Sequence, residues 1–439
     1  MSDEGTNTGP ETGSDAGPET GSETGSDAGP PTRSQRAPAP FISNADKLGY
    51  LPPFDGMRGI SVCLVILVHA TFEPFGGFAG TVDVFFVLSG FLITTLLLEE
   101  DRRAGRVDLR RFFSRRALRL LPLMYLVILG TLLAALAVHL LTDNRDLLDK
   151  AISDALAGGA YMYHVVHPVH VELVGGGPPE IRPLLHLWSL TVEEHFYVFG
   201  ALLVIVAVRR NWLQWVAAVF VVCWVGIGLA RLTGHVGPVF AWYQRPDSLM
   251  LGVVVAFLNA RIPGRLSETV GRRLRGAAWV ATGVLVGTFF IGTWFAKPFG
   301  LFVPFLVPEG GSLDDGLYWG EFGFSVIAAS VAIMSITFAR YRDHPVARFL
   351  SWKPFTELGR RSYAIYLLHV PIGVLLFETV SKVSEGLTLL IYFPLLAVCV
   401  EVAHRLVERP AMKMRLKLAG ADASGSSAAN SGSETSGSS

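Results

Sequence analysis

Ten apolar segments most constrain what this chain can fold into, because a helix of about 20 mostly apolar residues crosses the hydrocarbon core of a membrane. Residues 246–260 form the shortest and weakest of them. A further apolar stretch, residues 151–163, contains Asp154 and two glycines, which favours an interfacial or re-entrant helix over a span. We predict an all-α polytopic membrane protein with about ten transmembrane helices. The ten segments are residues 57–75, 81–98, 120–141, 187–208, 212–232, 246–260, 276–295, 319–339, 361–380 and 387–407.

Composition supports this class of protein. Charged residues make up 17% of the 439 residues and apolar residues 51%, whereas soluble proteins average about 25% charged. These values exclude a soluble globular enzyme and a nucleic-acid-binding protein. Cys63, Cys223 and Cys399 all lie inside apolar segments, so we expect neither a disulfide scaffold nor a zinc site.

The two ends of the chain differ from its centre. Residues 1–45 are rich in Gly, Ser, Thr, Pro and acidic residues and repeat the motif ETGSDAGP, and residues 419–439 are nearly all Gly, Ala and Ser. Segments with so few aliphatic side chains cannot bury enough surface to offset the entropy lost on ordering. Both ends are therefore predicted to be disordered, and residues 50–410 to form one transmembrane domain.

The loops between the spans alternate in basic charge. Arginine and lysine gather in residues 99–119, 209–210, 261–275, 340–360 and 409–417. Basic loops remain on the cytoplasmic side of a membrane. Ten spans then place both termini in the cytoplasm, and an eleventh span at 151–163 would put four basic regions outside.

The first span carries two ionisable residues, Arg58 and His69, eleven positions apart. At about 100° and 1.5 Å per residue they lie within roughly 20° of one helix face and about 16 Å apart along it. Ionisable groups at membrane depth are costly and usually functional. A snorkelling arginine and a hydrogen-bonded structural histidine would give the same pattern.

The fourth span begins with a polar stretch in which Ser189, Glu193 and Tyr197 recur every four residues and share a face. Glu194 is expected to point elsewhere. Counted from the outer helix ends, Glu193 and His69 lie at one depth, about 9 Å below the surface. A carboxylate beside an imidazole suits proton abstraction, and a buried structural pair is the alternative.

An arginine-rich segment precedes the third span. Arg111, Arg115 and Arg119 lie at helical spacing, with Arg116 beside them. Their guanidinium groups could bind phosphate oxygens or hold anionic lipid headgroups.

Other polar residues are weaker candidates. His164, His167 and His170 lie three apart, but a proline-containing loop offers no defined ligand geometry, so no metal site is expected. The remaining candidates for acceptor binding or structural polar contacts are Asp83, Trp188, Ser189, Arg245, Asp247, Tyr366 and His369.

Together these motifs resemble the membrane acyltransferase-3 family, which consists of bacterial integral-membrane O-acyltransferases. The similarity covers about residues 50–410 and agrees with the family's ten-helix core. The polar tail after Pro410 resembles the stand-alone type, which has no fused hydrolase-like domain. The matching stretches are FDGMRGISVCLVILVHA, VDVFFVLSGFLITTLLL, RRFFSRRALRLLPLMYL, LWSLTVEEHFY, RPDSLMLG and SYAIYLLHVP.

The resemblance implies a bacterial cytoplasmic-membrane enzyme that moves an acyl group, often acetyl, from cytoplasmic acyl-CoA to a hydroxyl. The acceptor would be a glycan, a lipid-linked sugar or a small molecule. His69 resembles the catalytic base, Arg58 its partner in donor binding and Glu193 the family's carboxylate. Acyl-CoA would be a co-substrate, and membrane lipids would surround the protein. The resemblance implies no bound cofactor.

The 16 Å between Arg58 and His69 would suit a long, thin donor whose phosphates stay at the basic inner face. The acceptor would then arrive from the outer side, near Asp83, Arg245 and Asp247. Direct attack and an acyl-histidine intermediate both fit these residues.

Two other functions remain open. A transporter or flippase for an acylated or polysaccharide intermediate would also use buried Arg, His and Glu. However, the two halves show no matching pair of interrupted helices, and the basic segment 99–119 has no counterpart, which favours an enzyme. A non-catalytic scaffold would leave the buried charges unexplained.

Overall fold

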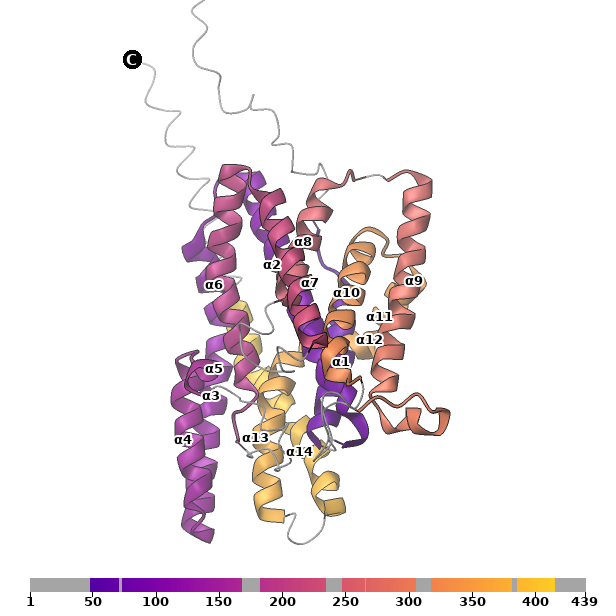
Figure 1. Cartoon of the computed structure of the whole chain (residues 1–439). Helices are drawn as coiled ribbons and strands as arrows, with labels where there is room; N and C mark the ends of the chain where they lie inside the picture. Colours follow the sequence, from indigo (N-terminus) through magenta and orange to yellow (C-terminus); the bar gives the residue numbers. More distant parts are fainter. Residues whose placement is uncertain are drawn as a thin grey trace, which may run out of the picture. The chain divides into compact units, whose positions relative to one another are not determined.

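The structure of the chain is a computed structural model (Figure 1). The residues that it describes all belong to one compact unit within residues 41–439. The tails predicted to be disordered, residues 1–45 and 419–439, lie outside them. The described residues are 48–70, 73–167, 182–233, 247–264, 266–304, 317–380 and 385–414.

Within these ranges the chain forms helices and turns, without a β-strand. The longer helices are α1 (Pro52–Ala70), α2 (Thr81–Ala104), α3 (Leu109–Thr142), α4 (Arg145–Gly159), α6 (Leu187–Arg210), α7 (Leu213–Leu232), α8 (Asp247–Arg261), α9 (Glu268–Ile291), α10 (Trp319–Arg340), α13 (Ser362–Val380) and α14 (Glu385–Ala403). The shorter ones are η2 (Glu73–Gly80), α5 (Tyr163–Val166), η4 (Trp294–Phe299), α11 (Pro345–Leu350), α12 (Lys353–Arg360) and η6 (His404–Glu408).

Nine helices of the described chain are long and apolar enough to cross a membrane, which confirms the all-α polytopic class. The short segment predicted around 246–260 is α8, with 15 residues. It packs against α2, α7 and α10, and ten of its residues are buried. Because other helices surround α8, it can be shorter than the membrane is thick. The cytoplasmic placement of both termini stays a prediction.

Two helix boundaries differ from the sequence-based expectation. The arginine-rich segment and the third span form one continuous helix, α3, whose Asp108 cap accepts a hydrogen bond from the Arg111 amide. Pro122 lies inside α3 without ending it. By contrast, the described part of α1 runs to Ala70, and the Glu73-Pro74 step disfavours a continuous helix as far as residue 75. His69 is therefore the penultimate residue of its helix.

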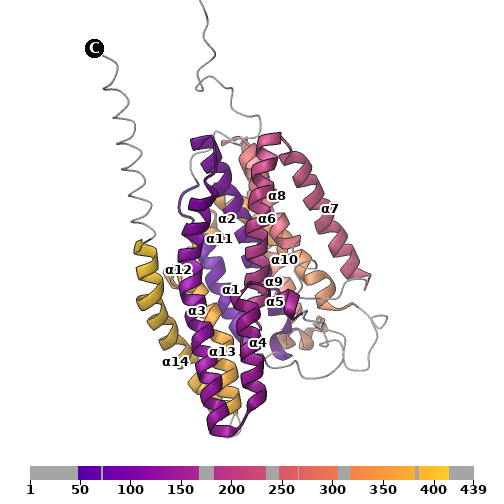
Figure 2. The same cartoon turned by 90° about the vertical axis from the view of Figure 1, so that its left-hand side faces the viewer.

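The apolar stretch 151–163, which was expected to form an interfacial or re-entrant helix, is divided between α4 and the start of α5. Helix α4 has 15 residues and is shorter than a span. Asn144 caps it by accepting a hydrogen bond from the Leu147 amide. Helix α4 lies alongside α3 in both views (Figure 1 and Figure 2). After Gly159 the chain turns into α5.

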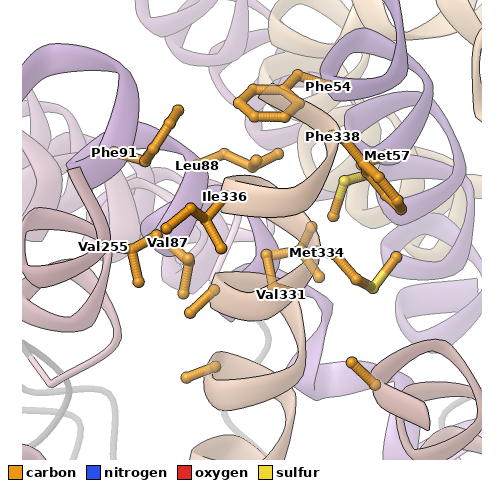
Figure 3. Close-up of a cluster of buried hydrophobic side chains, with 14 of the residues drawn as sticks. Phe54, Met57, Val87, Leu88, Phe91, Val255, Val331, Met334, Ile336 and Phe338 are labelled. Atoms are coloured by element: carbon orange, nitrogen blue, oxygen red, sulfur yellow. The ribbon is translucent and has the colours of Figure 1, made fainter. Parts of the chain in front are cut away.

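A large apolar core joins α1 and α2 to α8 and α10 (Figure 3). Phe54 packs edge-on against Phe91, with ring centroids 5.6 Å apart. Between membrane helices such contacts are stabilised by close van der Waals packing, because lipid tails are as apolar as these side chains. The core therefore sets the position of α1, which carries both Arg58 and His69. Its labelled members are Phe54, Met57, Val87, Leu88, Phe91, Val255, Val331, Met334, Ile336 and Phe338.

Helix α1 also crosses α12 at very close range. A Cβ atom at Gly59 would overlap the carbonyl oxygen of Phe355, and one at Gly359 would overlap that of Asp55. Only a hydrogen atom fits between the two backbones at these positions. This crossing holds the end of α1 that carries Arg58.

We expect Gly359→Ala to destabilise the protein by about 1–3 kcal/mol, the usual cost of overpacking. The methyl group would force α1 and α12 apart. Thermal unfolding in detergent measures the change, and Gly283→Ala is the control because its Cβ would meet nothing within 4 Å. Equal melting temperatures for the two variants would contradict the close crossing.

Candidate active site

Five helices, α1, α2, α3, α6 and α13, enclose a pocket of about 740 Å³ of empty space, counting its opening to solvent. One group of lining residues is cationic, another is aromatic and a third carries hydroxyl or carboxylate groups. The lining residues are Arg58, Val82, Phe85, Phe86, Ser89, Arg116, Arg119, Leu120, Ser189, Leu190, Glu193, Tyr197, Ser362, Tyr363 and Tyr366.

Three guanidinium groups face this pocket: Arg58 from α1, and Arg116 and Arg119 from α3. Arg58 is half-buried and makes no hydrogen bond or ion pair with any other described residue. An arginine without a protein partner in a pocket is available to an anionic ligand.

The other arginines predicted to bind the donor do not line the pocket. Arg115 lies 3.6 Å from Glu100, in an ion pair at the start of α3. Arg111 begins the same helix, where its amide binds the Asp108 cap. The pocket thus selects Arg116 and Arg119 from the predicted cluster, and Arg116 also contacts α6.

Arg116 joins α3 to α6. Its Nε donates to Oε1 of Glu194 at 2.8 Å, and its terminal nitrogen lies 3.8 Å from Glu193. The guanidinium carbon lies 3.2 Å from the ring centroid of Tyr197, a cation–π arrangement. Glu194 was expected to point away, but a single arginine fork reaches both neighbouring carboxylates.

Glu193 has partners of its own on α2 and α6. Tyr197 donates a hydrogen bond to its carboxylate at 2.7 Å, and Ser89 donates one at 3.3 Å. Among the described residues, no hydrogen bond joins Glu193 to His69. The expected pairing assumed equal distances from helix ends, whereas His69 lies at the very end of α1.

His69 belongs instead to a cluster of three imidazoles, which we call the histidine cluster: His69, His186 and His369. The rings of His69 and His369 lie edge to face with centroids 4.8 Å apart. The rings of His369 and His186 follow at 5.4 Å. His69 is exposed, while His186 and His369 are buried.

Sequence reasoning overlooked His186, which directly precedes α6. Burial, and then the neighbouring His69, lower the pKa of His186 to about 3, so this ring is neutral at physiological pH. A detectable signal was present, because a histidine at the start of an apolar helix that also carries two glutamates is unusual.

Tyr366 connects the pocket to the histidine cluster. Its hydroxyl donates to the backbone oxygen of His186 at 3.1 Å and lies 2.6 Å from the Ser189 hydroxyl. Its ring lines the pocket and lies 5.3 Å from the His369 ring. The pocket thus extends from Arg58 toward the imidazoles.

Other predicted polar residues lie in the packing between helices. Asp83 accepts a hydrogen bond from Ser248 at 2.6 Å, and Trp188 packs edge-on against Phe86. Neither they nor Asp247 line the pocket. Arg245 lies outside the described residues.

Asp247 forms a buried ion pair with Arg231 of α7. Both guanidinium NH₂ groups donate to its two oxygens, at 2.9 and 3.0 Å, and the side chains are 0% and 1% exposed. Arg231 was overlooked in the sequence, although an arginine late in an apolar span is itself a signal.

A polar cluster on α4 and α5 includes two of the loop histidines. His167 contacts Ser153 at 3.1 Å and Arg182 at 3.2 Å, and the ring of His164 lies 4.9 Å from that of His195. His170 lies outside the described residues. The described residues contain no group of three potential metal ligands.

Comparison with known proteins gives a consistent result. A family model described as "Acyltransferase domain" matches residues 52–403. The "O-acetyltransferase OatA" of Staphylococcus aureus is 31% identical over 382 residues, covering 84% of this chain and 58% of that protein. The "Peptidoglycan O-acetyltransferase OatA" of Listeria monocytogenes is 29% identical, covering 83% and 56%. The chain thus spans little more than half the length of these relatives. No solved structure matches it.

Proposed function

The chain belongs to the acyltransferase-3 family of multi-pass membrane proteins, and we propose that it transfers a short acyl group from acyl-CoA to a glycan hydroxyl. Acetyl is the proposed group, because the relatives are named O-acetyltransferases. One of them is named for peptidoglycan, so a cell-envelope glycan is the proposed acceptor.

The observation that carries this proposal is the pocket that runs from Arg58 to Tyr366. Its cationic side suits the phosphates of coenzyme A, because guanidinium forks match phosphate oxygens. From there α1 rises about 16 Å to His69. A pantetheine arm is long and thin enough to carry a thioester along such a path.

The hydrogen bond of His69 supports its role as the base. Its Nδ1 lies 2.9 Å from the backbone oxygen of Val65. A carbonyl oxygen can only accept, so Nδ1 carries the proton and Nε2 keeps a free lone pair. This tautomer is the one that can take a proton from a hydroxyl.

The proposed reaction conserves atoms and charge. Nε2 of His69 takes the acceptor's hydroxyl proton while the oxygen attacks the thioester carbonyl carbon. The carbon–sulfur bond then breaks, and the leaving thiolate receives the proton from His69. The products are an O-acyl ester and free coenzyme A.

Glu193 takes a different part in this proposal from the one that its sequence position indicates. With Glu194 it neutralises and orients Arg116, which faces the pocket. The two carboxylates would thereby set the direction of a phosphate-binding guanidinium.

Reconstituted protein tests the proposed function directly. The full chain in liposomes is supplied with labelled acetyl-CoA and a soluble peptidoglycan fragment, and the labelled ester is identified by mass spectrometry. Base-labile label on the glycan is the expected result. Hydrolysis or transport of label without ester formation would overturn the proposal.

Arg58→Ala is expected to raise the KM for acyl-CoA by about 10- to 100-fold, the effect of losing one charge-assisted hydrogen bond. The glycan KM should change little. Arg348→Ala is the control, because Arg348 is an exposed arginine of α11 that does not line the pocket. Equal donor KM values for both variants would remove Arg58 from the donor site.

A further inference from the structure

Nε2 of His369 is a buried polar atom that has no hydrogen-bond partner among the described residues. The residue is 1% exposed, and buried nitrogen and oxygen atoms are nearly always paired. The atom lies in a ring that packs against the proposed base, His69. The unpaired nitrogen of His369 beside the proposed base therefore needs a physical explanation.

The tautomers of the two rings provide that reason. Nδ1 of His369 lies 2.6 Å from the backbone oxygen of Tyr366, so it must carry a proton, as Nδ1 of His69 does toward Val65. Each neutral ring then has one lone pair, on Nε2. Two lone pairs cannot form a hydrogen bond with each other.

Protonation of His69 changes this relation. Once Nε2 of His69 holds the acceptor's proton it becomes a donor, and Nε2 of His369 is the unused acceptor of the neighbouring ring. The ring centroids lie 4.8 Å apart, and the contact requires a side-chain rotation of His69 that brings the two Nε2 atoms within hydrogen-bond distance.

We propose that His369 is a positioning residue that accepts a hydrogen bond from protonated His69 and so stabilises the imidazolium formed during acyl transfer. This inference rests on the proposed function. His369 neither gains nor loses a proton: the proton moves from the acceptor hydroxyl to His69 and from there to the leaving thiolate.

Among the described residues near His69, the candidates to accept this hydrogen bond are imidazoles. The groups around His69 are His369 of α13, His186 at the start of α6 and, one ring further, Tyr366. No carboxylate among the described residues bonds to His69. The ring contact of His69 is with His369, at 4.8 Å, whereas the ring contacts of His186 are with His369 and Tyr366, at 5.4 and 5.5 Å.

The rate–pH profile of the full-length protein tests the inference. A general base must be unprotonated to act, so the rate rises with pH through the titration of His69. Without an acceptor at position 369 the imidazolium is less stable. In His369→Phe the acidic limb should therefore move about 1–2 units lower, and the plateau rate should fall about 10- to 100-fold.

His369→Gln keeps an acceptor oxygen and should restore much of the wild-type rate and the position of the limb. His139→Phe is the matched control on α3, away from the pocket. If the Phe variant is not recovered as folded protein, His369→Met removes the acceptor with an unbranched side chain. A lower rate with an unmoved limb would assign His369 a structural role and overturn the inference.

A second measurement does not depend on acyl transfer. In ¹³C-histidine-labelled protein without acyl-CoA, the His69 signal is identified by its loss in His69→Gln and then titrated. Its midpoint should fall by about 1–2 units in His369→Phe, and an unchanged midpoint would overturn the inference. Failure of the wild type to transfer acyl groups would instead overturn the proposed function.

Discussion

His69→Ala is expected to lower acyl turnover by about 10²–10⁴, the usual contribution of a general base. The side chain is the exposed member of the histidine cluster, and Nε2 is its free nitrogen. The apolar core that positions α1 does not include it, so the variant should fold and insert. Single-turnover transfer from labelled acetyl-CoA measures the effect.

Donor binding separates this prediction from a general loss of structure. The variant should keep its Kd for acyl-CoA, because Arg58 and Arg116 remain in the pocket. His139→Ala is the control: it removes a half-buried histidine near the end of α3 that does not line the pocket. Near-normal turnover in His69→Ala would eliminate the mechanism and favour the transporter.

Asp247→Leu is expected to destabilise the protein by about 3–5 kcal/mol, since it removes the carboxylate that binds both NH₂ groups of the buried Arg231 guanidinium. Both side chains are almost fully buried, and a hydrogen bond from Arg231 to Ser325 at 3.2 Å is among the contacts that remain. Chemical unfolding in detergent, or the yield of folded protein, provides the measurement.

The double variant Arg231→Met, Asp247→Leu should recover most of that loss, because apolar replacement of a buried pair is often neutral. Asp343→Leu is the matched control. It breaks an ion pair with Arg275 whose side chains are 45% and 65% exposed, and such pairs contribute about 1 kcal/mol or less. A double variant as unstable as Asp247→Leu would assign the pair a role beyond charge compensation.

The proposed donor site and the helix packing thus use different charged residues. Arg58 lines the pocket and has no hydrogen-bond or ion-pair partner in the described part of the chain, whereas Asp247 is paired with Arg231 within the helix packing. From the sequence the two look alike, because each is an ionisable residue at the edge of an apolar segment. Whether such a residue binds a ligand or stabilises the packing depends on its hydrogen-bond and ion-pair partners, and these lie on other helices.

Several features of the protein follow from local sequence. The approximate bounds of the nine long spans of the described chain follow from runs of apolar residues, and the shared face of Arg58 and His69 depends on helical periodicity. The helical spacing of the arginines before the third span also predicted a helix, because spacing along the chain is a local property. These features need no knowledge of how the helices pack.

Contacts between residues of different helices could not be predicted from local sequence. The depth comparison that paired His69 with Glu193 assumed common helix ends, and the end of α1 at Ala70 removes that assumption. Glu194 shares Arg116 with Glu193 because a long side chain crosses from α3. Each of these contacts joins residues more than 70 positions apart.

The sequence by itself therefore determined the membrane class, the spans and a list of ionisable candidates. The tertiary structure alone decided that Arg58 and Arg116 face one pocket, that Asp247 pairs with Arg231, and that His69 neighbours His369. The physical reason is that periodicity sets which face of a helix a residue occupies, whereas packing of the apolar cores sets which helix that face meets.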